Sequence, residues 1–213
     1  MSPMPEASTV SRDTPKSRRT RARILEEAVR VIAENGYAAT TNAAVAEAAE
    51  ITRGAMLYHF PTRESLLEAT IDHIQAQRSE MFRDAADSLP AGADVTEHAI
   101  ETYWDLLHRL PFVAFAELEA ASRTDPLVRE LLAPSLAAFD RAQIGDHFLK
   151  MLHAGAGPRF QASRDLARFM LEGMARAQVT YDKDERVERL LTVIKRATHM
   201  LNRKGGVTDL WPE

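Results

Sequence analysis

Apolar residues recur along the chain at intervals of three and four positions, which is the period of an amphipathic helix. The first such run is formed by Ile24, Leu25, Ala28, Val31 and Ile32. The period of two that would predict a β-strand is not found in the N-terminal part, and the remainder follows the helical period as well. The pattern therefore predicts an all-α fold.

Helix boundaries follow from the residues that start and stop helices. Glycine accepts the left-handed backbone that often follows a helix, and proline disfavours helical geometry in the residue before it. Residues 1–15 are rich in Ser, Thr and Pro and are predicted to form a disordered tail. The predicted helices span residues 17–35, 41–49, 52–60, 63–87, 94–109, 111–123, 126–154, 160–181 and 184–203.

The second and third predicted helices are short and are joined by a tight turn at Glu50-Ile51. Such a pair predicts a helix-turn-helix, in which the second helix lies in the major groove of DNA and reads base edges with its N-terminal residues. On a helical wheel this second helix has two faces. Its apolar arc is predicted to pack on the two helices before it and consists of Met56, Leu57 and Phe60. Its other arc is small, aromatic or polar and consists of Gly54, Ala55, Tyr58 and His59.

A glycine inside this short helix indicates that something large approaches its N-terminal end. Gly54 costs about 1 kcal/mol of stability relative to alanine, and a helix N-terminus attracts phosphate through its free N–H groups and its dipole. Arg53 suits a guanine, because it presents two donors to O6 and N7, and Ala55 can meet a thymine methyl. Tyr58 and His59 are better placed for phosphates, which fix the register of a protein on DNA without reading its sequence.

The stretch from about Arg19 to Ile74 resembles the DNA-binding domain of the tetracycline-repressor (TetR) family of transcriptional regulators. The matching motifs stand in fixed register and are Asn35-Gly36-Tyr37, Thr40-Thr41, Val45-Ala46, Thr52-Arg53-Gly54 and Phe60-Pro61-Thr62-Arg63-Glu64-Ser65-Leu66-Leu67. The resemblance implies phosphate contacts by Thr41 and Arg63, which both lie at predicted helix N-termini. It also raises the alternatives that the basic residues before the first helical run lie along the DNA, enter a minor groove, or form a solvated tail. The predicted DNA-binding residues are Arg18, Arg19, Arg21, Thr41, Thr52, Arg53, Gly54, Ala55, Tyr58, His59 and Arg63.

Two positions depart from the family pattern. The family usually has glycine in the turn, where this chain has Glu50. We therefore expect either an altered turn or a strained conformation of Glu50. The family usually has a DNA-contacting tyrosine at the position of Leu57, whereas the tyrosine here is Tyr58, which we expect to reach a phosphate.

The resemblance divides the chain into a DNA-binding domain at 16–75 and an all-helical ligand-binding and dimerisation domain at 76–213. It implies a homodimer that binds a palindromic operator as a repressor and is released by a small-molecule effector, with coupling through the long helix 63–87. The alternative that the sequence does not exclude is an activator, or an orphan regulator without a ligand.

Two further sets of residues are candidates in the C-terminal part, and for each residue alone packing in the chain's own core is the alternative. The predicted pocket supplies aromatic, flexible and a few polar side chains: Tyr103, Trp104, Leu107, His108, Phe112, Phe115, Glu119, Phe139, Phe148 and Met151. The predicted dimer interface consists of Phe169, Met170, Met174, Leu190, Leu191 and Ile194.

Charge and composition restrict this picture without changing it. The net charge is -4 and the pI is about 6.0, so any DNA binding depends on where the charges lie and not on their total. Residues 16–23, KSRRTRAR, carry five positive charges and no negative one. The chain has no cysteine, which excludes disulfides and thiolate metal sites. It has no apolar run long enough to span a bilayer and no secretory signal, so no membrane partner and a cytoplasmic location are expected.

A helical-bundle enzyme is the remote alternative. The sequence lacks a nucleophile elbow, a phosphate loop and a His-Glu-x-x-His motif. A di-iron bundle needs paired Glu-x-x-His motifs, and Asp105-x-x-His108 is only one loose analogue. No catalytic residue, metal or cofactor is therefore predicted.

Overall fold

The computed structural model of the chain describes residues 14–144, 158–177 and 184–202. Within them the backbone forms helices and turns and contains no strand, which confirms the predicted all-α class. The helices are α1 (Pro15–Asn35), α2 (Asn42–Ala48), α3 (Arg53–His59), α4 (Arg63–Asp87), α5 (Val95–Leu106), α6 (Leu110–Ser122), α7 (Pro126–Ile144), α9 (Pro158–Ala177) and α10 (Asp184–Asn202).

Most predicted boundaries lie within a few residues of these, and the differences have local causes. Helix α1 begins before the predicted residue 17, because the Thr14 hydroxyl caps it by accepting from the Ser17 amide at 3.2 Å. Helix α6 begins before Pro111, which is tolerated in a first helical turn, and α5 ends at Leu106. The predicted stretches 1–13, 145–154 and 178–181 lie outside the described residues.

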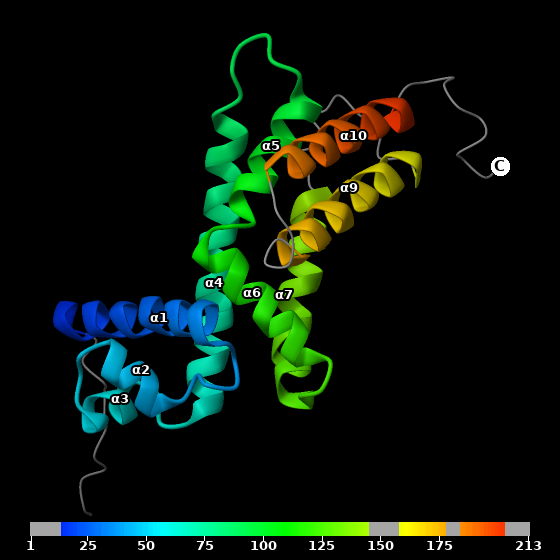
Figure 1. The fold of residues 1–213 in the computed structure, drawn as a ribbon. Coiled ribbons are helices and arrows are strands. Elements are labelled where there is room, and N and C mark those ends of the chain that lie inside the picture. Colours follow the sequence, from blue (N-terminus) through cyan, green and yellow to red (C-terminus); the bar gives the residue numbers. More distant parts are fainter. Residues whose placement is uncertain (1–13, 145–157, 178–183, 203–213) are drawn as a thin grey trace, which may run out of the picture.

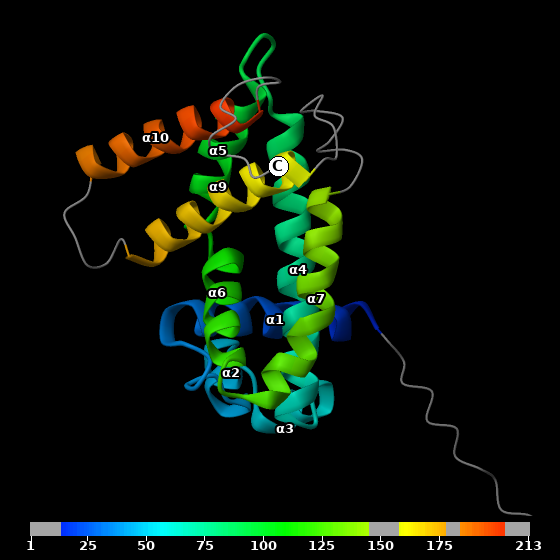
Figure 2. The ribbon, with the colours of Figure 1, turned by 90° about the vertical axis from the view of Figure 1, so that its right-hand side faces the viewer.

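The long helices α4 and α7 run along the molecule, and the shorter α6 lies beside them in the half next to α1 and α2 (Figures 1 and 2). Helices α2 and α3 lie at one end, and α5, α9 and α10 gather at the other (Figure 1). Helix α1 crosses α4 and also packs against α6 (Figure 1). We call α1, α2, α3 and the N-terminal part of α4 the head.

The head has a core of its own, which we call the head cluster. It holds α2 and α3 against α1 and the start of α4. Its buried members are Ile24, Leu25, Ala28, Val45, Ala46, Ala49, Met56, Phe60 and Leu66. Burying a large side chain of this kind contributes about 1.5–3 kcal/mol, so the positions of the two short helices depend on this packing and not on their own helical propensity.

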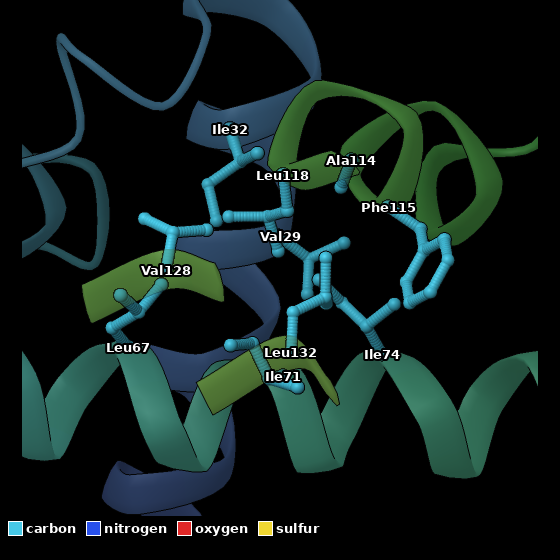
Figure 3. Close-up of a cluster of buried hydrophobic side chains, with 10 residues drawn as sticks. All are labelled: Val29, Ile32, Leu67, Ile71, Ile74, Ala114, Phe115, Leu118, Val128 and Leu132. Carbon is cyan, nitrogen blue, oxygen red and sulfur yellow. The ribbon is translucent and has the colours of Figure 1, made fainter. Parts of the chain in front are cut away.

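A second core, the central cluster, joins the head to the long helices. Its side chains come from α1, α4, α6 and α7 and point toward one another (Figure 3). They are Val29, Ile32, Leu67, Ile71, Ile74, Ala114, Phe115, Leu118, Val128 and Leu132. The boundary predicted after residue 75 falls inside α4 and this core continues across it.

A third core, the C-terminal cluster, lies between α5, α9 and α10. Its buried members are Ile100, Leu171, Met174 and Ile194, and larger side chains such as Tyr103 and Trp104 pack against them. Within the described residues, no helix is both long and apolar enough to cross a membrane.

Candidate DNA-binding surface

The two short helices of the head are each started by a threonine. The Thr41 hydroxyl accepts from the Ala44 amide at 3.1 Å, and the Thr52 hydroxyl accepts from the Ala55 amide at 3.2 Å. Both threonines are exposed, so they cap a helix at the surface where DNA contact is predicted for them. The Asn42 side chain also donates to the Phe60 carbonyl at 3.1 Å and ties the start of α2 to the end of α3, a contact that the sequence did not indicate.

The turn between these helices contains Glu50 at the position where glycine is usual in the TetR pattern. Glu50 has φ 50°, the only positive φ of a residue other than glycine in the described part of the chain. The Ile51 amide donates to the Ala46 carbonyl and the Glu50 amide to the Glu47 carbonyl, both at 3.0 Å. This is a Schellman turn, which usually has glycine at the left-handed position. Of the two expectations for Glu50, the strained conformation is therefore confirmed.

Helix α3 is anchored by one stripe of side chains and leaves the rest exposed. Met56 is 1% exposed and Phe60 is 2% exposed, whereas Leu57 is 41% exposed and Tyr58 is 65% exposed. The prediction that Leu57 packs in the core is wrong, because α3 is only seven residues long and α1 and α2 cover a single stripe of it. Leu57 and Tyr58 therefore both lie on the open surface of α3.

The N-terminal end of α3 has open space around it. Among the described residues, a Cβ atom placed on Gly54 would meet only the Thr52 hydroxyl, at 3.9 Å, which is an ordinary contact. Gly54 has a helical backbone, so neither packing against the described part of the chain nor backbone geometry requires glycine there. Arg53 is exposed beside it, and Ala55 is partly exposed.

Tyr58 and His59 lie together at the C-terminal end of α3, with ring centroids 5.1 Å apart and nearly perpendicular ring planes. Burial, and then the nearby charge of Arg21, lower the pKa of His59 below its ordinary value of 6.5. His59 is therefore neutral at pH 7 and can offer a phosphate a hydrogen bond but not a positive charge.

The basic segment predicted to contact DNA is part of α1 and is not an extended arm. Arg18, Arg19 and Arg21 lie on exposed turns of this helix. An α-helix with its side chains is about 10–12 Å wide, and the minor groove is about 6 Å wide. The helix itself is thus too wide for a minor groove, and the contacts of these three arginine side chains with DNA stay a prediction. The Arg21 guanidinium lies 5.1 Å from the centre of the Phe60 ring.

Arg63, predicted to bind phosphate, already has an intramolecular partner. It is the first residue of α4, and its guanidinium donates to the Tyr37 carbonyl at 3.3 Å and lies 4.6 Å from the centre of the Tyr37 ring. The Tyr37 hydroxyl in turn donates to Asp125 Oδ2 at 3.1 Å. The sequence did not indicate this link between the head and the turn that joins α6 to α7.

The structure brings together only part of the predicted ligand pocket. The rings of Tyr103, Phe112 and Phe82 contact one another, and the Tyr103 hydroxyl donates to Glu172 at 2.7 Å. Phe115 belongs to the central cluster, so its inclusion in the pocket is wrong.

Other pocket candidates are placed elsewhere or are not described. Trp104 and Leu107 pack against the C-terminal cluster, and exposed His108 contacts the Trp104 ring at 4.7 Å between centroids. Phe139 lies in α7, with its side chain outside the described part of the structure. Phe148 and Met151 lie outside the described residues altogether.

A buried charged group lies next to these rings and was missed from the sequence. Arg78 on α4 is 3% exposed, and its guanidinium lies 3.6 Å from the centre of the Phe115 ring and 5.0 Å from that of Phe112. Desolvation lowers the pKa of Arg78 to about 10, so it remains charged at neutral pH. Its spacing from Ile71 and Ile74 continues the buried stripe of α4, which is the one sequence signal that could have located it.

Two acidic residues share this region with arginines of α9. Glu172 accepts from Arg168 at 2.8 Å, and Glu119 accepts from Arg176 at 3.1 Å. Burial, and then the charge of Glu172, raise the pKa of Glu119 above its ordinary value. The described residues contain no cluster of His, Asp or Glu side chains that could hold a metal ion.

The predicted dimer interface is largely used within the chain. Met174 and Ile194 are buried in the C-terminal cluster, so their assignment to an intersubunit surface is wrong for this arrangement. Met170, Leu190 and Leu191 are partly buried against the same cluster. Phe169 is 62% exposed and remains available. The other exposed large apolar residues of α9 and α10 are Leu166, Val193 and Met200.

Comparison with known proteins is consistent with this geometry. The fold and the exposed α3 define a helix-turn-helix protein of the kind found in bacterial regulators. Residues 24–70, which run from α1 into α4, match the family model described as bacterial regulatory proteins, tetR family. This matched segment contains the helix-turn-helix, and over it the chain resembles TetR-family regulators.

Its similarity to a curated relative covers part of each protein. The chain is 32% identical over 111 residues to the HTH-type transcriptional regulator CymR of Pseudomonas putida, which is 52% of this chain and 55% of CymR. The match thus spans about half the length of that relative. Curated relatives are named as transcriptional regulators, and none of those reported is named as an enzyme.

Solved structures resemble the chain over most of its length. GusR of Salmonella enterica has a TM-score of 0.61 at 20% identity, over 86% of this chain and 95% of GusR. The multidrug binding protein EbrR, complexed with imidazole, has a TM-score of 0.57 at 20% identity, over 89% of this chain and 98% of EbrR. At this level of identity the likeness concerns the fold alone.

Proposed function

We propose that the chain is a DNA-binding transcriptional regulator that reads an operator with α3 and is controlled by a small-molecule effector. The observation that carries this proposal is the open face of α3. Met56 and Phe60 fix the helix from one side, while Arg53, Gly54 and Tyr58 face space that no described part of the chain fills. A helical glycine that the fold does not need is explained if a DNA groove approaches there.

Individual residues have distinct roles in this proposal. Arg53 at the start of α3 contacts a base edge, because an arginine there can donate twice to a guanine. Tyr58 donates a hydrogen bond to a phosphate, and the exposed arginines of α1 lie along the DNA backbone. Leu57 replaces the tyrosine that is usual at this position in the family and offers an apolar contact, so we expect a base preference different from that of typical relatives.

The proposed regulator acts as a homodimer that binds a palindrome, because two copies of α3 can then read two half-sites. The exposed apolar residues Leu166 and Phe169 on α9, and Val193 and Met200 on α10, support such a pairing. Repression with release by the effector is the form that we propose. Activation, or regulation without an effector, differs only in the sign or the trigger. A protein with this role works in the cytoplasm, where the bacterial chromosome lies.

An effector site is proposed among α4, α5, α6 and α9, around Tyr103 and Phe112. EbrR, with a similar fold, is titled a multidrug binding protein in complex with imidazole. An effector bound there would shift the population between arrangements of the long helices that differ in operator affinity. The residues proposed for this site combine aromatic rings with the carboxylates of Glu119 and Glu172.

The test is a selection of random duplexes with the purified full-length chain, followed by binding measurements on the selected operator and on a scrambled duplex. Arg53→Ala should lose about 1–3 kcal/mol of operator affinity and relax specificity at one base pair. Gly54→Ala should also weaken operator binding, because its methyl group projects toward the groove. The same variant should unfold at a higher denaturant concentration, because alanine is the better helix former by about 1 kcal/mol.

The matched control is Arg109→Ala, which removes an exposed positive charge beside α6, away from the head. It should leave the operator affinity unchanged at equal salt. If no duplex is enriched, or if Arg53→Ala and Arg109→Ala behave alike, α3 does not read DNA and the proposal fails.

A further inference from the structure

Tyr37 occupies a position from which it contacts both ends of the helix-turn-helix. Its carbonyl accepts from the Thr40 amide at 3.0 Å, next to the cap of α2. The same carbonyl accepts from Arg63, the first residue of α4, at 3.3 Å. Residues 40 and 63 lie on either side of the α2–turn–α3 unit in the sequence, so one residue contacts the segments through which this unit enters and leaves.

The side chain of Tyr37 connects this point to the body of the molecule. Its hydroxyl donates to Asp125 Oδ2 at 3.1 Å, and its ring packs against the central cluster. Asp125 lies in the α6–α7 turn, at the same end of the molecule as α2 and α3 (Figure 1). The Arg63 guanidinium lies over the Tyr37 ring, 4.6 Å from the ring centre.

Asp125 is itself fixed. Its other oxygen, Oδ1, accepts from the amides of Leu127 at 3.0 Å and Val128 at 3.3 Å, at the start of α7. The Val128 amide, followed by the Tyr37 hydroxyl, lowers the pKa of Asp125 below its ordinary value. The carboxylate is therefore ionised at neutral pH. One of its oxygens accepts from the start of α7 and the other accepts from Tyr37.

We propose that Tyr37 is a positioning residue for DNA recognition. It ties both ends of the α2–turn–α3 unit to the α6–α7 turn and so fixes the orientation in which α3 is presented to DNA. The inference rests on the proposed function for its DNA readout. Whether Tyr37 holds the α2–turn–α3 unit in place can be measured without DNA. Specific binding needs α3 in one register in the groove, whereas non-specific binding needs only phosphate contacts.

The experiment uses two substitutions that each remove the hydrogen bond between Tyr37 and Asp125, one at the donor and one at the acceptor. Tyr37→Phe keeps the ring under Arg63 and removes the hydroxyl. Asp125→Ser keeps one oxygen to cap α7, but its side chain is too short to reach Tyr37. The matched control is Glu101→Ala, which removes the ion pair between Glu101 of α5 and Lys195 of α10, at the other end of the molecule.

The first readout is hydrogen exchange of backbone amides in the full-length chain. Tyr37→Phe and Asp125→Ser should each speed exchange in residues 38–45 and 63–67, and the double variant should exchange no faster than either single one. Glu101→Ala should leave those amides unchanged. Unchanged exchange in Tyr37→Phe, or additive effects in the double variant, would overturn the inference.

The second readout is the ratio of affinities for the selected operator and for a scrambled duplex. Tyr37→Phe should lower this ratio by about fivefold or more, since a hydrogen bond to a charged partner is lost. Non-specific affinity should stay the same, whereas a variant that simply unfolds would lose both. A wild-type chain without any selective binding would refute the proposed function, and the exchange measurement would still decide whether Tyr37 holds the unit.

Discussion

At the scale of single residues, the interior between α4, α6 and α9 is unusual because it contains charges. Arg78 is almost fully buried, and Glu119 is largely shielded from solvent although it pairs with Arg176. Burying a charge costs free energy unless partners compensate for it. The raised pKa of Glu119 reports that the compensation for this carboxylate is incomplete.

This shielding of Glu119 has a consequence for the pH dependence of stability. The folded chain holds the Glu119 proton more tightly than the unfolded chain, so the stability that this residue contributes is present at low pH and is lost as pH rises from about 4.5 through its raised pKa. Glu119→Gln removes this titration. Its free energy of unfolding, measured with urea, should therefore increase relative to wild type between pH 4.5 and pH 7.

The comparison requires a control for the change of charge. Glu130→Gln removes the same charge from an exposed position on α7 and should not produce this increase. A difference between Glu119→Gln and wild type that is flat or falls over this pH range would show that Glu119 is not destabilised by burial.

At the scale of elements, the turn between α2 and α3 sets how the two helices meet. Its Schellman hydrogen bonds require a left-handed residue, and the chain places Glu50 there. Left-handed geometry costs an L-residue about 1–2 kcal/mol. The turn nevertheless forms, because Ala49 and Met56 on either side of it are buried in the head cluster.

Glu50→Gly should therefore stabilise the chain by about 1 kcal/mol, which is less than the full relief because glycine also increases the entropy of the unfolded state. The denaturant midpoint reports the change. Glu47→Gly is the natural counterpart, since Glu47 is exposed and helical only three residues away, and it should destabilise by about 1 kcal/mol. Two substitutions with the same sign would mean that the φ of Glu50 is not the cause.

Local signals in the sequence were sufficient to predict the helices and the helix-turn-helix. Thr41, Thr52 and Thr62 each cap a helix that the sequence predicted, because capping depends on neighbours within three residues. What failed depends on contacts between distant segments. Neither the exposure of Leu57 nor the pairing of Arg63 with Tyr37 is determined by spacing along the chain.

In the C-terminal helices, too, contacts between distant segments could not be predicted from the sequence. Helices α9 and α10 carry apolar residues on more than one face, and a helical period does not say which face packs within the chain. Met174 and Ile194 are buried in the C-terminal cluster, whereas Phe169 and Val193 are exposed. The predicted pocket failed at Phe115 for the same reason, because its partners come from α1, α4 and α7.

At the scale of the whole molecule, the exposed apolar residues of α9 and α10 lie at the end opposite the proposed DNA-reading helix (Figure 1). Apolar residues left exposed together on neighbouring helices are typical of surfaces that bind another protein. A second copy of the chain is the partner that we propose, because it would place two reading helices on one duplex.

Phe169→Lys should convert the dimer into a monomer, because it places a charge on the apolar surface and leaves the C-terminal cluster intact. Sedimentation velocity reports the mass directly. Leu110→Lys changes an apolar residue that is 46% exposed at the start of α6, outside this surface, and should leave the mass unchanged. A Phe169→Lys chain that sediments like wild type would exclude α9 from the interface.

The central cluster also limits how such a protein can be recombined. Half of its side chains come from α1 and α4 and the other half from α6 and α7, so a chimaera joined at residue 75 would combine two half-cores from different parents. Their volumes would not match, and mismatched cores cost several kcal/mol. A DNA-reading specificity could be transplanted with far less disturbance by exchanging only residues 41–60. For engineers who build sensors, the exchangeable part is thus a short insert, and the rest of the chain behaves as one block.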